Sequence, residues 1–284
     1  MREGGVRRGW SARELPSYSL GGYPGGAAPL RTERCAYRGG IGMSERSHGR
    51  LVGVGVGPGD PELLTIKGLR TLREADEVFV PVGDTGEVGR AEAVVQAYLG
   101  PDHARRLLFA LTDDERTRAE NWERAAREVA DPLRQGKTCA FATIGDPNLY
   151  STFTYLVSSV RRVAEINVET VPGITAMQDL ASKSGTVLVV GDERLALLPF
   201  TAGEKAFRSA LDSFETVVCY KGGRRLGKVL EIADEAGRLE ETTYGSRLGM
   251  KGEEIVPASE MLGREGTYLS TLIFTRSVEV GGTD

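Results

Sequence analysis

A short apolar segment that ends in the turn Gly145-Asp146-Pro147 is well suited to hold a small ligand. Residues 140–144 (AFATI) predict a buried strand, and the turn stops it before a helix that opens at Tyr150. A strand that breaks at a glycine leaves free backbone groups at the carboxyl edge of a sheet, where α/β proteins hold ligands. Gly145 allows close backbone approach, and Asp146 orients the loop or a polar group of the ligand. The alternative is an ordinary strand-to-helix turn with an aspartate cap.

A second turn of this kind lies near the start of the patterned sequence. Residues 51–56 predict a strand, and Asp60 and Pro61 predict the cap and first residue of a helix whose apolar face holds Leu63, Ile66, Leu69 and Leu72. The glycines of this turn fall on every second residue from 53 to 59, which fits no G-x-G-x-x-G register. No Gly-Lys-Ser/Thr follows either, so neither a dinucleotide fingerprint nor a nucleotide-triphosphate loop is present. The turn suits a ligand without a pyrophosphate.

Alternation of strands and helices predicts a two-domain α/β protein. Residues 50–165 predict a domain of parallel β-α-β units, and residues 166–278 predict a second domain with a mixed sheet, because some of its strands are too close for a helix between them. A third turn, residues 172–176, joins a strand at 166–171 to a helix at 176–182. Further strands are expected at 78–82, 107–111, 187–190, 195–200, 216–220 and 268–274, and further helices at 90–99, 113–133 and 226–236.

Composition narrows the classes of function. The chain has 284 residues, of which 40% are hydrophobic and 27% charged, and its net charge of -4 argues against nucleic acid as the main partner. No apolar run approaches the roughly 20 residues that cross a bilayer, so we expect a cytoplasmic protein without a membrane partner. Its three cysteines (Cys35, Cys139, Cys219) and two histidines (His48, His103) are scattered. We therefore expect no disulfide and no bound metal.

Residues 1–42 differ from the rest of the chain. They are rich in Gly, Arg and Pro and have few periodic apolar positions, so we expect them to be disordered. One interpretation is a basic tail for an acidic partner. The other, which we favour, is that translation begins at Met43 and that the preceding residues are dispensable.

Together the three turns resemble those of the tetrapyrrole (corrin/porphyrin) methylase family, over residues 51–276. The turns are Gly55–Pro61, Gly145–Pro147 and Val171–Ala176, in this order. Residues 146–152, 191–199 and 268–272 resemble more closely the branch that methylates carbon 20 of precorrin-2, to give precorrin-3A, in cobalamin biosynthesis. The resemblance implies two α/β domains with S-adenosylmethionine, the methyl donor, in the cleft between them. It also implies a tetrapyrrole substrate and a homodimer.

The resemblance also implies which residues contact the cofactor. Those expected at S-adenosylmethionine are Pro58, Gly145, Asp146, Leu149, Ser151, Thr152, Thr175, Ala176, Tyr220 and Lys221. In one departure from the family pattern, Lys221 stands where relatives often have an apolar residue. No side chain is assigned as a catalytic base, since methyl transfer from a sulfonium needs alignment of donor and acceptor rather than a nucleophilic side chain.

The acceptor carries acetate and propionate arms, so its trough should hold cations. Arginine suits carboxylates because its planar fork binds both oxygens. The candidates near the ligand side are Arg90, Arg224, Arg225 and Arg247. Four alternatives remain: a cobalt-factor II methylase, another corrin-ring methylase, a non-catalytic S-adenosylmethionine-binding protein, and a nicotinamide-dependent oxidoreductase, which the failed glycine register disfavours.

Overall fold

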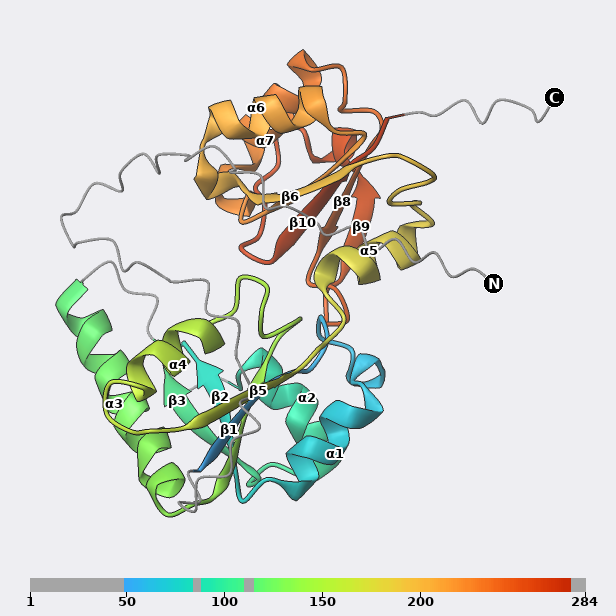
Figure 1. The fold of residues 1–284 in the computed structure, drawn as a ribbon. Helices are drawn as coiled ribbons and strands as arrows, with labels where there is room; N and C mark the ends of the chain where they lie inside the picture. Colours follow the sequence, from blue (N-terminus) through green and yellow to red (C-terminus); the bar gives the residue numbers. More distant parts are fainter. Residues whose placement is uncertain (1–48, 84–87, 110–114, 277–284) are drawn as a thin grey trace, which may run out of the picture. The chain divides into compact units, whose positions relative to one another are not determined.

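The computed structural model describes residues 49–83, 88–109 and 115–276. Residues 1–48 lie outside this part, so the expectations for residues 1–42, Met43, Cys35 and His48 fall outside the described residues. The described chain forms two five-stranded sheets with helices on both faces of each (Figure 1). The predicted two-sheet α/β architecture is confirmed.

The first sheet is parallel throughout, as predicted, with the strand order β3-β2-β4-β1-β5. Its strands are β1 (Arg50–Gly55), β2 (Glu77–Val82), β3 (Ala104–Leu108), β4 (Thr138–Thr143) and β5 (Asn167–Val171). The helices of this half are α1 (Ile66–Glu74), α2 (Arg90–Leu99), α3 (Glu115–Arg134) and α4 (Phe153–Val160). Since β5 pairs with β1, the chain leaves this sheet only after Val171, whereas we expected the second half to start at residue 166.

Apolar side chains on the two faces of the first sheet explain its layers. Leu72 of α1 and Val94 of α2 pack with Val52 of β1 on one face. On the other face Phe153 of α4 stacks on Phe141 of β4, with 5.9 Å between the ring centroids. Figure 1 shows α1 and α2 together on one side of this sheet and α3 and α4 on the other. Burial of these side chains stabilises the layers, at about 25 cal/mol per Å² of apolar surface.

The second sheet is mixed, as predicted, with the order β6-β7-β10-β8-β9. Its strands are β6 (Leu195–Pro199), β7 (Thr216–Tyr220), β8 (Thr242–Ser246), β9 (Glu254–Pro257) and β10 (Ser270–Phe274), and its helices are α5 (Ala176–Ser184), α6 (Glu204–Ser213) and α7 (Leu226–Glu235). β10 is antiparallel to both of its neighbours, and β6 is parallel to β7. Successive side chains of β7 point to opposite faces of this sheet. Val217 and Cys219 pack with α6 and α7 on one face, and Val218 packs with α5 on the other.

Some predicted elements differ from the observed ones. The strand predicted at residues 187–190 is wrong: this segment has no strand structure, and Val187, Val189 and Val190 are exposed. The helix predicted after Asp60 is divided into a 3₁₀ turn at Pro61–Leu63 and α1, because Thr65 caps a new start by accepting a hydrogen bond from the backbone of Gly68. Ile66, predicted to face inward, is 80% exposed.

The two described cysteines are structural. Cys139 in β4 and Cys219 in β7 are buried and free. Burial raises the pKa of each thiol to about 12, so both stay protonated at neutral pH and behave as small apolar side chains. His103 is exposed. No group of three or more metal-binding side chains occurs within the described residues, and no helix among them is long and apolar enough to cross a membrane.

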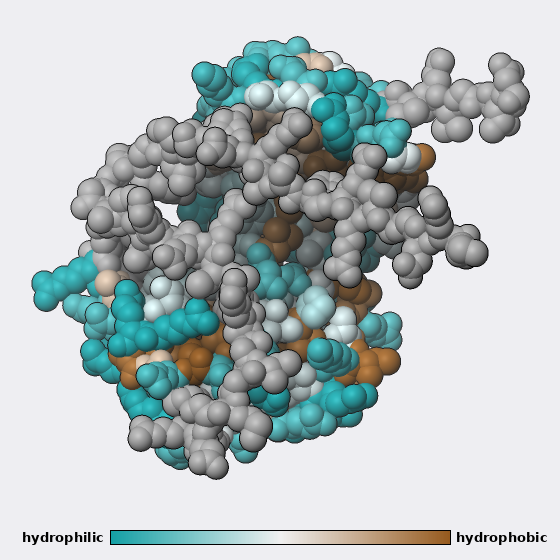
Figure 2. Space-filling view, viewed as in Figure 1, coloured by the Kyte–Doolittle hydropathy of each residue, from teal (hydrophilic) through white to brown (hydrophobic). Residues whose placement is uncertain are grey.

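Charged side chains cover much of the surface. Figure 2 shows hydrophilic residues over most of the visible described surface, interrupted by smaller hydrophobic patches.

The ion pair between Arg194 and Glu215 lowers a pKa strongly. Arg194 donates hydrogen bonds to Glu215 from its guanidinium and from its backbone, at 3.0 and 2.8 Å. These bonds lower the pKa of Glu215 from 4.5 to about 2.

We expect this pair to make a pH-dependent contribution to stability. Because the folded pKa of Glu215 is depressed, the contribution is complete above pH 4.5 and disappears as the pH falls toward 2. The difference in unfolding free energy between the parent and Glu215→Gln, measured by urea denaturation, should therefore shrink across this window. A difference that is constant between these pH values would contradict the assignment.

Candidate functional site

The three glycine-containing turns meet at the carboxyl ends of β4, β1 and β5. These strands are neighbours in the first sheet, which brings together turns that are far apart in sequence. The backbone N–H of Gly145 donates to the carbonyl oxygen of Gly57 at 2.8 Å. The backbone N–H of Gly173 donates to Oδ2 of Asp146 at 3.1 Å. The three turns therefore form one hydrogen-bonded cluster at the edge where parallel sheets bind ligands.

Two of the glycines are required for this packing. A Cβ on Gly55 would lie 2.6 Å from the backbone nitrogen of Gly173 and would overlap the carbonyl oxygen of Gly145. Gly145 has a φ of 69°, the left-handed region that glycine adopts without strain. Apart from Gly145 and its two chain neighbours, no atom of the described residues lies within 4 Å of a Cβ built on Gly145, and Gly145 itself lines a pocket. A side chain there would point into open space beside the ligand surface.

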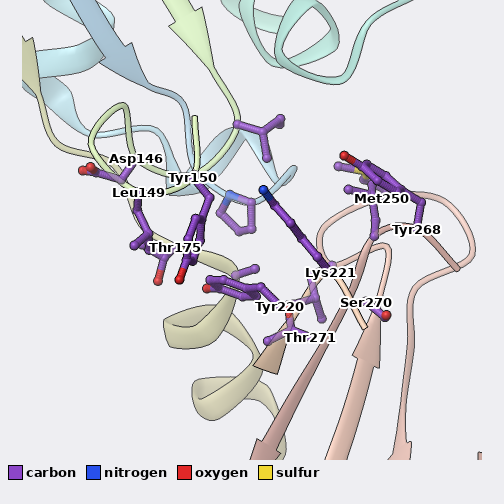
Figure 3. A pocket seen from close by; sticks show the side chains of 16 residues that line it. Asp146, Leu149, Tyr150, Thr175, Tyr220, Lys221, Met250, Tyr268, Ser270 and Thr271 are labelled. Atoms are coloured by element: carbon purple, nitrogen blue, oxygen red, sulfur yellow. The ribbon is translucent and has the colours of Figure 1, made fainter. Parts of the chain in front are cut away.

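Asp146 holds the cluster together. Its Oδ1 accepts a hydrogen bond from the backbone of Asn148 at 2.8 Å, while its Oδ2 accepts the bond from Gly173. Of its two expected roles, orienting the loop is the one that these contacts support. Figure 3 shows its carboxylate directed away from the amino group of Lys221.

A pocket lies against this cluster and is lined by residues of both halves of the chain. The lining residues from the first half are Pro58, Ile144, Gly145, Asp146, Leu149 and Tyr150. Those that follow β5 are Thr175, Ala176, Tyr220, Lys221, Leu248, Met250, Tyr268, Leu269, Ser270 and Thr271. The pocket thus combines turns of the first sheet with the start of α5, the carboxyl end of β7, the loop after β8 and the start of β10.

Eight of the ten residues predicted at the cofactor line this pocket, and two do not. Ser151 is buried, with its hydroxyl 3.0 Å from that of Thr143, and it accepts a hydrogen bond from the backbone of Phe153. Thr152 is the residue before α4, and its carbonyl oxygen accepts the bond from the backbone of Leu156. Both residues therefore stabilise the start of α4 and do not line the pocket.

Sequence reasoning did not assign several lining residues. Tyr268, Leu269, Ser270 and Thr271 belong to a segment that supports the family resemblance, so a signal for them was present. Tyr150 was predicted only as a helix start. Leu248 and Met250 follow β8, a strand that was not predicted, and nothing in their own sequence indicates a ligand.

Backbone strain is concentrated at this pocket. Within the described residues, the non-glycine residues with positive φ are Tyr150, Lys221 and Arg247, at 50°, 59° and 50°. Tyr150 and Lys221 line the pocket, and Arg247 immediately precedes the lining residue Leu248. Left-handed conformations cost a non-glycine residue about 1–2 kcal/mol and cluster at functional sites. The strain supports a functional role for this pocket.

Aromatic rings form one wall. The rings of Tyr150 and Tyr220 meet edge to face, with 5.9 Å between their centroids. The hydroxyl of Tyr220 accepts a hydrogen bond of 2.9 Å from the backbone of Met177 and so binds the end of β7 to the first turn of α5. Burial raises the pKa of Tyr220, which keeps its hydroxyl neutral.

The four predicted substrate arginines have different surroundings. Arg224 lies over the ring of Tyr268, with its Cζ 5.3 Å from the ring centroid. Arg225 forms an ion pair with Glu204 and lies over Phe200. Arg90 and Arg247 are exposed, and neither lines the pocket. Of the four, Arg224 is the arginine that lies over the ring of a lining residue.

Comparison with known proteins identifies the family of the chain. The family model of the tetrapyrrole (corrin/porphyrin) methylases matches residues 50–261, which is more than half of the chain and includes all three turns. The chain belongs to the tetrapyrrole methylase family. The resemblance that the turns indicated is thereby confirmed, and the motifs that carry that resemblance supply much of the pocket lining of this methylase.

Two curated relatives are each 36% identical to this methylase. One is a precorrin-2 C(20)-methyltransferase from Sinorhizobium sp, aligned over 240 residues that cover 81% of this chain and 97% of the relative. The other is a probable cobalt-precorrin-2 C(20)-methyltransferase from Methanocaldococcus jannaschii, aligned over 172 residues that cover 61% of this chain and 72% of the relative.

Solved structures share the fold of this methylase. A putative cobalamin synthesis related protein from Corynebacterium diphtheriae matches with a TM-score of 0.61 and 18% identity, over 80% of this chain and 98% of the other. Uroporphyrin-III C-methyl transferase from Thermus thermophilus, complexed with S-adenyl homocysteine, matches with a TM-score of 0.57 and 23% identity. The match covers 80% of this chain and 97% of the other chain. At these identities the likeness supports the fold alone.

Proposed function

We propose that this methylase transfers a methyl group from S-adenosylmethionine to carbon 20 of precorrin-2, giving precorrin-3A in cobalamin biosynthesis. One observation carries the proposal: the motif turns form a pocket in a chain that is 36% identical to a precorrin-2 C(20)-methyltransferase along 97% of that protein. The same identity to the Methanocaldococcus relative keeps the cobalt-containing substrate, cobalt-factor II, as the alternative. Another corrin-ring methylase is the next alternative.

The residues of the pocket fit S-adenosylmethionine chemically. Tyr150 and Tyr220 offer aromatic faces to an adenine ring or a sulfonium. Ile144 and Leu149 supply apolar contact. The backbone N–H of Ala176, at the start of α5, has no acceptor among the described residues and can donate to the ligand. Aromatic, apolar and backbone donor groups thus match the parts of the cofactor.

In this proposal the chain contributes alignment rather than covalent chemistry. S-adenosylmethionine supplies a methyl group that its sulfonium activates for in-line displacement. The fixed turns around Gly145 hold donor and acceptor in line, and the apolar wall excludes water. Among the described lining residues there is no histidine or cysteine, which agrees with a reaction that needs no protein nucleophile.

The proposal is tested by incubating the purified protein with S-adenosylmethionine and either precorrin-2 or cobalt-factor II. Mass spectrometry and NMR should detect one added methyl group, at carbon 20, on one of the two substrates. If the protein binds S-adenosylmethionine but methylates neither substrate, it is a non-catalytic binding protein or a methylase of another ring position.

We also propose that the protein acts as a homodimer in the cytoplasm. The family resemblance supports the dimer, and the exposed Val187, Val189 and Val190 provide apolar surface on which a second copy could pack. Light scattering after size-exclusion chromatography should give twice the mass of the 30.6 kDa chain. A monomeric mass at micromolar concentration would contradict the dimer.

A further inference from the structure

Two cations three positions apart follow β7 on the loop Lys221-Gly222-Gly223-Arg224. The Nζ of Lys221 lies 5.1 Å from the ring centroid of Tyr150, and Cζ of Arg224 lies 5.3 Å from that of Tyr268. Both tyrosines line the pocket, although they come from opposite halves of the chain. The loop therefore presents two positive charges, one from the lining residue Lys221 and one from Arg224, which reaches the pocket through its contact with Tyr268.

These two cations have no acidic partner in the part of the chain that the structure describes. The neighbouring cations differ in this respect, because each has an acidic partner. The pairs are Arg225 with Glu204, Lys228 with Glu231, and Arg264 with Glu254. The unpaired charges are thus the two that lie over rings of the pocket.

Packing holds the loop in place, although one of its residues has an unfavourable backbone conformation. Lys221 has a φ of 59°, and a Cβ on Gly223 would lie 2.6 Å from the hydroxyl oxygen of Ser270 and would overlap the backbone of Thr267. Figure 3 shows the amino group of Lys221 extended into the pocket, between Tyr150 on one side and Met250 and Tyr268 on the other. A fixed loop reduces the ordering entropy that binding must overcome.

We infer that Lys221 and Arg224 bind two carboxylates of the tetrapyrrole acceptor, one each, and so set which edge of the macrocycle faces the methyl donor. This inference rests on the proposed function. It assigns Lys221 to the acceptor instead of the cofactor, because S-adenosylmethionine carries more positive than negative charge and an ammonium group suits a polyanion better. Arg225 is excluded, since Glu204 already pairs with it.

The test measures binding of uroporphyrin III, a stable porphyrin with an acetate and a propionate arm on every pyrrole ring, by fluorescence quenching at low salt. Lys221→Met and Arg224→Met should each weaken binding by roughly tenfold or more, as expected for a lost hydrogen bond between charged groups. Arg225→Met is the matched control and should stay within about twofold. Added salt should reduce the differences between parent and variants.

Two further measurements separate binding from a structural effect. Affinity for S-adenosylhomocysteine, measured by calorimetry, should stay within about twofold in every variant, because the inference assigns both cations to the acceptor and moves Lys221 away from the cofactor role that the family resemblance implies. Lys221→Arg, unlike Lys221→Met, should still bind the porphyrin, since it keeps the positive charge. With the natural acceptor, both methionine variants should raise KM more than they lower kcat.

Several results would overturn the inference. If the parent does not bind uroporphyrin III at low salt, or if both methionine variants bind it as the parent does, the carboxylates are recognised elsewhere. If Lys221→Met weakens S-adenosylhomocysteine binding instead, Lys221 is a cofactor ligand. These readouts do not depend on turnover, so failure of the parent to methylate precorrin-2 refutes the proposed function separately.

Discussion

Replacing Gly145 by valine should weaken S-adenosylhomocysteine binding by about 100-fold or more, equal to ~2.7 kcal/mol, while the protein still folds. The new side chain would extend into the pocket, because Gly145 lines it and no other described residue outside its chain neighbours lies within 4 Å of the new Cβ. It would also disfavour the φ of 69° that directs the backbone N–H toward Gly57. Calorimetry with S-adenosylhomocysteine measures the loss.

Gly185 provides a matched control for this experiment. It ends α5 with a φ of 71°, a Cβ there also meets open space, and it does not line the pocket. Gly185→Val should therefore have a similar backbone cost, of about 1–2 kcal/mol, and should bind the ligand normally. Parental affinity in Gly145→Val, or an equal loss in Gly185→Val, would contradict the placement of the cofactor beside Gly145.

Replacing Arg238 by methionine should destabilise the protein by about 3 kcal/mol or more. This arginine is only 4% exposed, and its guanidinium donates to five backbone carbonyl groups. The acceptors are the carbonyl oxygens of Leu211, Phe214, Glu215, Phe274 and Thr275. Methionine fills similar volume but leaves buried carbonyl oxygens without donors. Urea denaturation measures the loss.

Arg127 provides a control that shows how much stability changes when an exposed arginine is replaced by methionine. It is exposed and pairs with Glu123 one helical turn away, so Arg127→Met should change stability by less than about 0.5 kcal/mol. Arg238→Lys should recover little, because a single ammonium group cannot reach all the carbonyl oxygens that lie around the edge of the planar guanidinium group. If Arg238→Met unfolds at the parental urea concentration, the buried carbonyls have found other donors.

The first sheet could be predicted because its signals are local. Apolar runs such as residues 51–56 and 140–144 are bounded by glycine turns, and alternation with helices implies parallel strands. The second sheet was predicted less completely. β8 (TTYGS) and β9 (EIVP) are short and partly polar, and their burial comes from neighbours that are distant in sequence. For α6 the helical spacing of Phe207, Ala210 and Leu211 was present but not used.

The residues of the candidate site also divide into those that local sequence signals predict and those that depend on contacts distant in sequence. Turns with glycine and aspartate could be found in the sequence, since their backbone geometry requires those residues. Leu248 and Met250 could not, because only the pairing of β8 with β10 brings their loop to the pocket. Ser151 illustrates the opposite error: a polar residue beside a motif was assigned to the ligand, but its hydroxyl bonds to Thr143 within the core.

The central place of β10 in the second sheet has a consequence for synthesis on the ribosome. All five strands of the first sheet have been made once residue 171 is added, so this half can fold while the rest is still being translated. The second sheet lacks its middle strand until residues 270–274 emerge. Because Ser270 and Thr271 also line the pocket, a nascent chain arrested before residue 270 would carry all three turns but lack one wall of the pocket.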